Sequence, residues 1–281
     1  MTLDLKLQKL KEILSSYDKI LVALSGGVDS AFLLAFSCKH LGAGNVSAIT
    51  ANGPHLAQDE VDYAAKLCEA LGINHTEADL SHILPIIKLN PQDRCYHCKR
   101  EIFTIFCEKA KDGGYVLCDG TNLDDMNDYR PGHKALAELN VASPLKEAEL
   151  TKNDIREALH ELATDDENIK AALTLPNGMG IWDKPAFACL ASRIPYGEII
   201  TVEKLEAVYK AETYLRSLGF TQVRVRHHGD IARIETTADE MNKFFEESLM
   251  AEVNNNIKNC GFKYAVLDLG GYKMGGGYHG K

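Results

Sequence analysis

Ser25-Gly26-Gly27-Val28-Asp29-Ser30 stands between an apolar run, 19–24, and a stretch of helical character, 31–41. A short apolar run that ends in turn residues is typical of a strand buried in a parallel sheet. The two glycines let the backbone turn sharply, and the helix that follows offers unpaired N–H groups and the positive end of its dipole to an anion. The stretch therefore predicts a phosphate-binding loop.

The loop differs from a Walker loop, in which a lysine follows the last glycine and reaches the outer phosphates. No lysine follows Gly26 and Gly27. Backbone N–H groups and the hydroxyls of Ser25 and Ser30 would instead hold a pyrophosphate, with the carboxylate of Asp29 facing Mg²⁺. This arrangement favours chemistry at the α-phosphate of ATP. The alternative is an ordinary Gly-Gly turn between a strand and a helix.

Strand and helix patterns alternate along residues 1–163, which predicts an α/β domain with a parallel sheet. Strands are expected at 19–24, 45–51, 73–80 and 114–118, with helices at 3–17, 31–41, 59–71, 98–111 and from about 150, where Thr151 or Asn153 would cap the helix. Parallel sheets bind ligands at the carboxyl ends of their strands. The turns 25–30 and 119–125 are therefore expected to face the same ligand.

The remainder of the chain predicts a connection and a smaller domain. Prolines and glycines between 164 and 186 indicate a long connection inside a segment 164–200. Residues 201–281 are expected to form a small α+β domain. Its expected elements are a helix at 201–218, hairpin strands at 220–226 and 231–235 joined by 227–230, a helix at 238–259 and a closing strand at 264–269.

Composition excludes some classes of function. A net charge of -9 over 281 residues opposes broad binding of nucleic-acid backbone. The sequence contains no run of about twenty apolar residues and its start lacks the apolar core of a signal peptide, so we expect a cytoplasmic protein that does not enter membranes. Eight cysteines in such a protein favour reduced thiols, metal ligation or catalysis over disulfides.

A second group of polar residues, Gly120-Thr121-Asn122-Leu123-Asp124-Asp125, follows the fourth expected strand, with Asp128 and Arg130 close behind. Carboxylates this close repel one another unless they are solvated, paired or bridged by a cation. Mg²⁺ on nucleotide phosphates would be such a cation, with Asp29 and Asp125 as its carboxylate ligands. The alternative is a solvated acidic helix start.

The loop 25–30 resembles the PP-loop ATP pyrophosphatase superfamily, and further strings resemble its LarE family over the chain from about residue 12. The strings are Gly120-Thr-Asn-Leu-Asp-Asp125, Asp128-Tyr-Arg-Pro-Gly132, Ser143-Pro-Leu145, Leu150-Thr-Lys-Asn-Asp-Ile-Arg156 and Lys184-Pro-Ala-Phe-Ala-Cys-Leu-Ala-Ser-Arg-Ile-Pro-Tyr-Gly197. The resemblance implies an ATP-dependent sulfur transferase. It would adenylate a carboxylate of pyridinium-3,5-biscarboxylic acid mononucleotide, a small nucleotide substrate, and convert it to a thiocarboxylate.

This resemblance assigns roles to residues. Asp29 and Cys189 would be catalytic. ATP would be bound by Ser25, Gly26, Gly27, Asp29, Ser30, Thr50, Ala51, Gly120, Thr121, Asn122, Asp125 and Arg130. The adenine would lie near Thr50 and Ala51, at the end of the second strand. Family members are assembled from several subunits, so the resemblance implies a homo-oligomer, with 201–281 as the domain for substrate binding and oligomerisation.

The sulfur source has several candidate explanations. Some LarE proteins sacrifice a single cysteine, matched here by Cys189, and others hold a [4Fe-4S] cluster that carries an added sulfide. Cys95 and Cys98 form a C-x-x-C, and with Cys189 they could ligate three irons. Half a zinc site, a redox dithiol and inert thiols are the alternatives. The five other cysteines lie in apolar patterns and are expected to be buried side chains.

Arg224 and Arg226 alternate with valines, so both are expected on one face of a strand. Their forked guanidinium groups suit a phosphate. In the LarE family this pair looks like part of the substrate site, together with Ser192, Arg193, Glu212 and Glu235. The alternative is that the two glutamates form structural salt bridges with the arginines.

Two stretches depart from the LarE pattern. Residues 164–180 look longer than the usual connection, and the tail 271–280 lacks an arginine and a Ser-Met-Asn ending. Trp182, Asp183 and Lys184 are expected to order the segment before Cys189. Rival functions are a PP-loop tRNA thiolase, an ammonia-dependent amide ligase and an adenine-nucleotide sensor.

Overall fold

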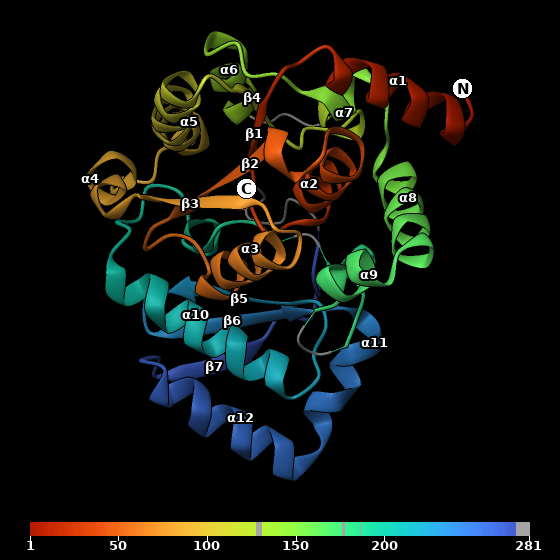
Figure 1. The fold of residues 1–281 in the computed structure, drawn as a ribbon. Coiled ribbons are helices and arrows are strands. Elements are labelled where there is room, and N and C mark those ends of the chain that lie inside the picture. The colour runs from red at the N-terminus through yellow and green to blue at the C-terminus, as the bar shows by residue number, and fades with distance from the viewer. Residues whose placement is uncertain (128–130, 176–177, 186, 274–281) are drawn as a thin grey trace. The chain divides into compact units, whose positions relative to one another are not determined.

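The computed structural model describes residues 1–127, 131–175, 178–185 and 187–273 (Figure 1). The chain divides into two compact units. The first comprises Met1–Gly53, Gln58–Ile83 and Asp93–Phe187, and the second comprises Pro54–Ala57, Leu84–Gln92 and the chain from Ala188 onward. Residues 164–187 thus belong to the first unit and 188–200 to the second.

The first unit is built on a four-stranded parallel sheet in the order β3-β2-β1-β4. The strands are β1 (Ile20–Ala23), β2 (Val46–Asn52), β3 (Asn74–Asp79) and β4 (Val116–Cys118). All of β1 is buried because it lies between two other strands, with Ile20 in register with Val46 on one side and Val116 on the other. The predicted α/β fold with a buried first strand is confirmed.

Helices cover this sheet. They are α1 (Leu3–Ser15), α2 (Val28–Leu41), α3 (Gln58–Ala70), α5 (Arg94–Gly113), α6 (Pro131–Glu138), α7 (Pro144–Glu147), α8 (Lys152–Asp165) and α9 (Glu167–Leu173). Phe32, Leu33 and Leu34 are fully buried, so α2 runs through the core of the unit. Helix α8 lies against α2 and starts with a capping box between Thr151 and Asp154, which confirms the expected cap.

The expectation of a long irregular connection at 164–186 was wrong in its first part. Helix α8 continues to Asp165, and α9 follows at once. The Asp166 side chain caps α9 by accepting hydrogen bonds from the N–H groups of Asn168 and Ile169, at 2.8 and 3.2 Å. Ile169, Ala172 and Leu173 bury one face of the short helix. The cap and the apolar face together make this polar-looking stretch helical.

The second unit contains a three-stranded sheet in the order β5-β6-β7. Its main elements are α4 (Leu84–Ile87), α10 (Val202–Ser217), β5 (Val223–His228), β6 (Ile231–Thr236), α11 (Ala238–Met241), α12 (Glu247–Asn259) and β7 (Tyr264–Leu267). The antiparallel hairpin β5-β6 is confirmed, and β7 pairs with β6 in parallel. The expected four-residue connection 227–230 is shorter, because His228 pairs with Ile231. The expected helix 238–259 is broken into α11, a 3-10 turn at Asn242–Phe245, and α12.

The segment Leu84–Gln92 is tied into the second unit through Asn90. The side chain of Asn90 is fully buried, and its Nδ2 donates to the carbonyl oxygens of Ile194 and Pro195 at 3.0 and 2.7 Å. The Asn90 carbonyl oxygen accepts from the N–H of Gly197 at 2.9 Å. These bonds join two parts of the chain that lie 104 or more residues apart in the sequence.

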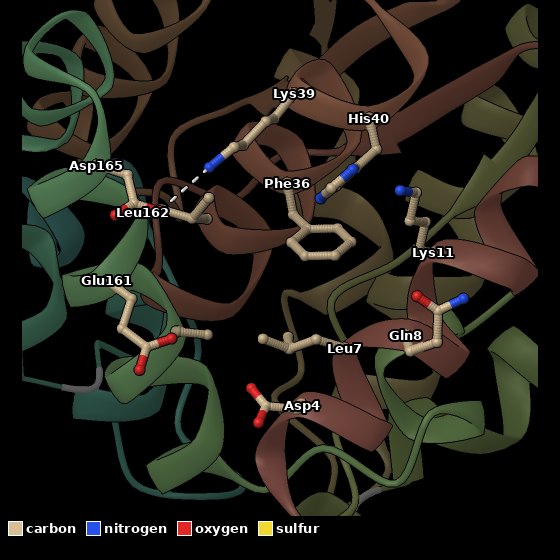
Figure 2. A pocket seen from close by; sticks show the side chains of 11 residues that line it. Asp4, Leu7, Gln8, Lys11, Phe36, Lys39, His40, Glu161, Leu162 and Asp165 are labelled. Carbon is tan, nitrogen blue, oxygen red and sulfur yellow. Dashed lines mark ion pairs between the residues drawn. The ribbon is translucent and has the colours of Figure 1, made fainter.

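A hollow of about 280 Å³ opens between α1, α2 and α8 of the first unit (Figure 2). Leu7, Phe36 and Leu162 contribute its apolar surface, and an ion pair of 3.5 Å joins Lys39 and Asp165 beside them. The hollow lies at the carboxyl-terminal half of α2, where the helix dipole opposes an anion. The hollow is therefore not suited to phosphate, unlike the loop at the other end of α2. Within the described ranges no helix is long and apolar enough to cross a membrane.

Candidate active site

The loop 25–30 joins the end of β1 to the start of α2, as the sequence predicts. Gly26 has φ +75° and is buried, whereas Val28, Asp29 and Ser30 already form the first turn of α2. The Ser30 hydroxyl accepts from the Ser25 N–H at 3.2 Å and lies 3.1 Å from the Ser25 hydroxyl. Among the described residues no side chain caps α2. The N–H groups of its first turn thus remain available to an anion.

The two glycine-bearing loops lie against each other. A Cβ atom added to Gly120 would come within 2.9 Å of the Ser30 backbone nitrogen. A Cβ on Gly26 would lie 2.6 Å from the carbonyl oxygen of Glu60, at the start of α3. Only glycine permits either approach without displacing backbone atoms. The structure therefore brings 25–30 and 120–125 together, as expected from their places at the ends of neighbouring strands.

Two aspartates meet where these loops adjoin. Asn122 Nδ2 donates to Asp29 Oδ2 at 3.1 Å, and the Asn122 N–H donates to Asp125 Oδ2 at 3.4 Å. Lys152 Nζ lies 3.0 Å from Asp125 Oδ1. Burial, and next the negative charge of Asp125, raise the pKa of Asp29 from 3.8 to about 6, against the opposing effect of Lys152. Two carboxylates held this close suit a divalent cation, which would relieve their repulsion.

Hydrogen bonds fix the rest of the second loop. Asp119 accepts from the Ser143 hydroxyl at 2.6 Å and from the Thr121 hydroxyl, and all three side chains are buried. These bonds hold the end of β4 so that Asn122 and Asp125 face α2. Arg130, also expected to bind ATP, lies outside the described residues, as does Asp128.

Thr50 and Ala51 lie near the carboxyl end of β2, in the same sheet as the loop. Thr50 is buried, and its hydroxyl is 2.8 Å from His75 Nε2 on β3. Burial lowers the pKa of His75 from its usual range, which favours the neutral imidazole. Ala51 is half-buried. Contact of these two residues with adenine stays a prediction.

The sequence alone did not predict that Lys184 contacts the loop 25–30 or that Arg156 holds Lys184. Lys184 Nζ donates to the Gly26 carbonyl oxygen at 2.8 Å and pairs with Glu60 Oε2 at 2.7 Å. Arg156, on α8, donates to the carbonyl oxygens of Trp182 and Lys184. Lys184 and Arg156 both belong to strings that resemble the LarE family. No local sequence pattern, however, indicates that Lys184 contacts Gly26, which lies 158 positions away.

The second unit places the predicted substrate residues in a network of buried ion pairs. Arg193 and Glu212 form a two-pronged pair at 2.8 and 3.0 Å, with both side chains fully buried. Arg226 forms a second such pair with Glu235, at 3.1 and 2.9 Å, and also donates to the Ser192 carbonyl oxygen. These pairs match the alternative given by the sequence, in which Glu212 and Glu235 form structural salt bridges with arginines. A role in binding substrate stays a proposal.

Arg224 sits in this network with a different set of contacts. Its Nη1 donates to the Val223 carbonyl oxygen at 2.8 Å, and its guanidinium lies 5.4 Å from the centre of the Tyr272 ring. Burial, followed by the charge of Arg193, lowers the pKa of Arg224 to about 10. Arg224 and Arg226 occupy alternate positions of β5 and therefore lie on one face of the strand, where both side chains are buried.

Comparisons with known proteins show which family the chain belongs to. A family model described as NAD synthase matches residues 5–103, which include the loop 25–30. The pyridinium-3,5-bisthiocarboxylic acid mononucleotide synthase of Lactiplantibacillus plantarum is 37% identical over 276 residues, covering 98% of this chain and 94% of that protein. The chain belongs to the LarE family. It is an enzyme of the ATP pyrophosphatase class, related to sulfur-transferring synthases.

Two further relatives match over nearly the same length. An uncharacterized protein of Synechocystis sp. is 40% identical over 97% of both chains. An uncharacterized protein of Methanocaldococcus jannaschii is 29% identical over 95% of this chain and 97% of its own length. The similarity therefore spans both units, not the loop alone.

Cys189, the expected sulfur donor, is half-buried and immediately precedes the 3-10 turn Leu190–Arg193 of the second unit. Cys95 and Cys98 are half-buried in the first two turns of α5, in the first unit. Their i, i+3 spacing puts both thiols on one side of the helix, which fits a pair of thiolate ligands. Within the described ranges no three His, Cys, Asp or Glu side chains form a metal-binding group.

The remaining five cysteines were expected to be buried, but only Cys68 and Cys118 are, and the other three are half-buried. Burial raises the pKa of each of these thiols, to about 12 for Cys68. A thiol with such a pKa is neither a good nucleophile nor a ready metal ligand at neutral pH. They are Cys38, Cys68, Cys107, Cys118 and Cys260.

Proposed function

We propose that this protein is an ATP-dependent sulfur transferase acting on pyridinium-3,5-biscarboxylic acid mononucleotide. The observation that carries the proposal is the phosphate loop, with Asp29 beside Asp125, in a chain 37% identical to a pyridinium-3,5-bisthiocarboxylic acid mononucleotide synthase over 98% of its length. The loop accounts for binding of ATP, and the relative accounts for the choice of substrate. Activation of a carboxylate and its conversion to a thiocarboxylate follow from the two together.

The loop supplies the adenylation half of the reaction. A carboxylate oxygen of the substrate attacks the α-phosphorus of ATP, and the pyrophosphate that leaves is held by the N–H groups at the start of α2. Mg²⁺ held by Asp29 and Asp125 would neutralise phosphate charge when bound. Lys152, 3.0 Å from Asp125, keeps that carboxylate oriented.

The cysteines supply the sulfur half. In the sacrificial route, the Cys189 thiolate attacks the acyl carbon of the adenylate and AMP leaves. Loss of a proton from the Cys189 Cα then breaks its Cβ–S bond, which leaves dehydroalanine and the thiocarboxylate. In the other route, Cys95, Cys98 and Cys189 would ligate a [4Fe-4S] cluster, which would supply sulfide without consuming a cysteine.

The buried arginines of the second unit support binding of an anionic substrate. Arg193 and Arg226 are held by Glu212 and Glu235, while Arg224 carries a pKa lowered by burial and by the charge of Arg193. A phosphate brought near Arg224 would relieve that repulsion. Binding of the mononucleotide phosphate by this residue is part of the proposal.

The adenylation step is tested with the purified protein, ATP, Mg²⁺ and the pyridinium substrate. We expect AMP and pyrophosphate to form together and only with substrate present, and Asp29→Ala to abolish both while Asp112→Ala, an exposed carboxylate of the same unit, has no effect. Unchanged turnover in Asp29→Ala would refute the loop's role. Incorporation of labelled ammonia, or a shift of bulk tRNA at moderate salt, would favour the amide ligase or the tRNA thiolase.

The sulfur source is tested by anaerobic purification. With a cluster, brown iron-sulfur absorption is expected and is lost in Cys95→Ala, Cys98→Ala and Cys189→Ala, but kept in Cys260→Ala. With the sacrificial route, the protein is colourless and loses one sulfur atom from Cys189 during a single turnover. Thiocarboxylate formation that survives Cys189→Ala would contradict both routes.

A further inference from the structure

Lys184 places a charged donor directly behind the phosphate loop. Its Nζ lies 2.8 Å from the Gly26 carbonyl oxygen and 2.7 Å from Glu60 Oε2. The two side chains of this ion pair are only 14% and 15% exposed. The ammonium also lies 5.0 Å from the centre of the Tyr63 ring. All of these residues belong to the first unit, so the contact does not depend on the placement of the second.

The hydrogen bond from Lys184 to the Gly26 carbonyl oxygen determines the direction of the Gly27 N–H, which is a donor inside the loop. The carbonyl of Gly26 and the N–H of Gly27 belong to one trans peptide group, in which they point in opposite directions. With the carbonyl held by Lys184, the Gly27 N–H points away from Lys184 and toward Ser25 Oγ, at 3.4 Å. Gly27 is the N-cap residue of α2, so this N–H adjoins the donors of the first helical turn.

A peptide between two glycines needs such an anchor. Neither residue has a Cβ to restrict rotation of the peptide group, so several orientations are sterically open to it. Lys184 is itself held, because Arg156 Nη2 donates to its carbonyl oxygen at 2.9 Å. Helix α8 therefore fixes Lys184, and Lys184 fixes the loop. A Walker lysine instead contacts the phosphates, from a position next to the glycines.

We propose that Lys184 is a positioning residue for the pyrophosphate of ATP, acting by holding the Gly26–Gly27 peptide with its N–H toward the phosphates. The inference rests on the proposed function, since it assumes that the loop binds ATP. It assigns Lys184 to the adenylation step, although the residue lies five positions before Cys189 in the sequence.

The test compares pyrophosphate with AMP, because only pyrophosphate depends on the loop. Titration calorimetry with Mg²⁺-pyrophosphate and, separately, AMP is carried out on the full chain. Lys184→Met is expected to weaken pyrophosphate binding roughly 10- to 100-fold, the range for a lost hydrogen bond to a charged group. AMP binding is expected to stay within about twofold, and Lys184→Arg to restore part of the loss.

Lys6→Met is the matched control. Lys6 forms an ion pair of 2.6 Å with Asp154 in the same unit, and the side chains are 13% and 19% exposed. Its loss should lower Tm about as much as Lys184→Met does and leave both affinities unchanged. Glu60→Gln removes the ion pair but keeps the hydrogen bond from Lys184 to Gly26, so we expect its pyrophosphate affinity to be retained. This variant provides the test if Lys184→Met does not fold.

Unchanged pyrophosphate affinity in Lys184→Met, or an equal loss for AMP, would overturn the inference. So would a tenfold loss of pyrophosphate affinity in Glu60→Gln. If the unmodified protein binds neither ligand, the proposed function itself fails, and the two failures are thereby distinguished.

Discussion

Replacing Asp29 by asparagine is expected to make the protein more stable while abolishing ATP turnover. Burial and the charge of Asp125 raise the pKa of Asp29 from 3.8 to about 6, so the folded state disfavours the charged carboxylate. A rise of this size corresponds to up to about 3 kcal/mol above pH 6, and we expect about 1–3 kcal/mol because Asp29 is only half-buried. Asparagine keeps an oxygen that can accept from Asn122.

The sign of the effect follows from the raised pKa. Below pH 3.8 the Asp29 carboxyl is neutral in both the folded and unfolded states, so the variant gains nothing. Its advantage grows as pH rises from 3.8 to about 6 and is constant above that range.

Urea denaturation of both proteins between pH 4 and pH 8, without Mg²⁺ or nucleotide, measures this difference. A gain that is independent of pH, or a loss of stability at pH 7.5, would refute the reasoning. Mg²⁺ with ATP should then stabilise the unmodified protein and leave the variant unaffected, since the variant lacks one of the two carboxylates proposed to hold the cation.

Two further variants test other parts of the structure. Glu212→Ala leaves the Arg193 guanidinium buried without its carboxylate and should lower the free energy of unfolding by about 3–5 kcal/mol, as measured by urea denaturation. The double variant with Arg193→Met should lose less than the sum of the losses in the two single variants. Additive losses would contradict the buried ion pair. Gly26→Ala and Gly42→Ala both place alanine at positive φ, but only at Gly26 does the Cβ meet the Glu60 carbonyl oxygen. Both should lose about 1 kcal/mol or more of stability, whereas only Gly26→Ala should stop AMP formation; equal activity in the two would count against the loop geometry.

Local patterns were sufficient to predict the first unit. Strand patterns predicted all four parallel strands, including the mostly polar β3, and the glycine-bearing turns after β1 and β4 identified the two loops that meet at Asp29 and Asp125. The helix α9 could also have been predicted, since Asp166 is a good cap and Ile169, Ala172 and Leu173 have helical spacing. The nearby proline and glycines concealed it.

Other features depend on contacts that no local pattern records. Alternation along β5 predicted that Arg224 and Arg226 share one face of the strand, but it cannot show that Glu212, on α10, accepts from the Val225 N–H and from Arg193. The contact of Lys184 with Gly26 likewise joins residues 158 positions apart. Such pairings are decided by how elements pack, which a single sequence does not specify.

The bonds of Asn90 bear on how the chain is made. Its two acceptors, the carbonyl oxygens of Ile194 and Pro195, are 104 and 105 residues further on. At a synthesis rate of about 5–20 residues per second, Asn90 waits roughly 5–20 s for them. The second unit therefore cannot form as each piece emerges from the ribosome, and a fragment that begins at Ala188 would lack the Asn90 donor for these two carbonyl oxygens.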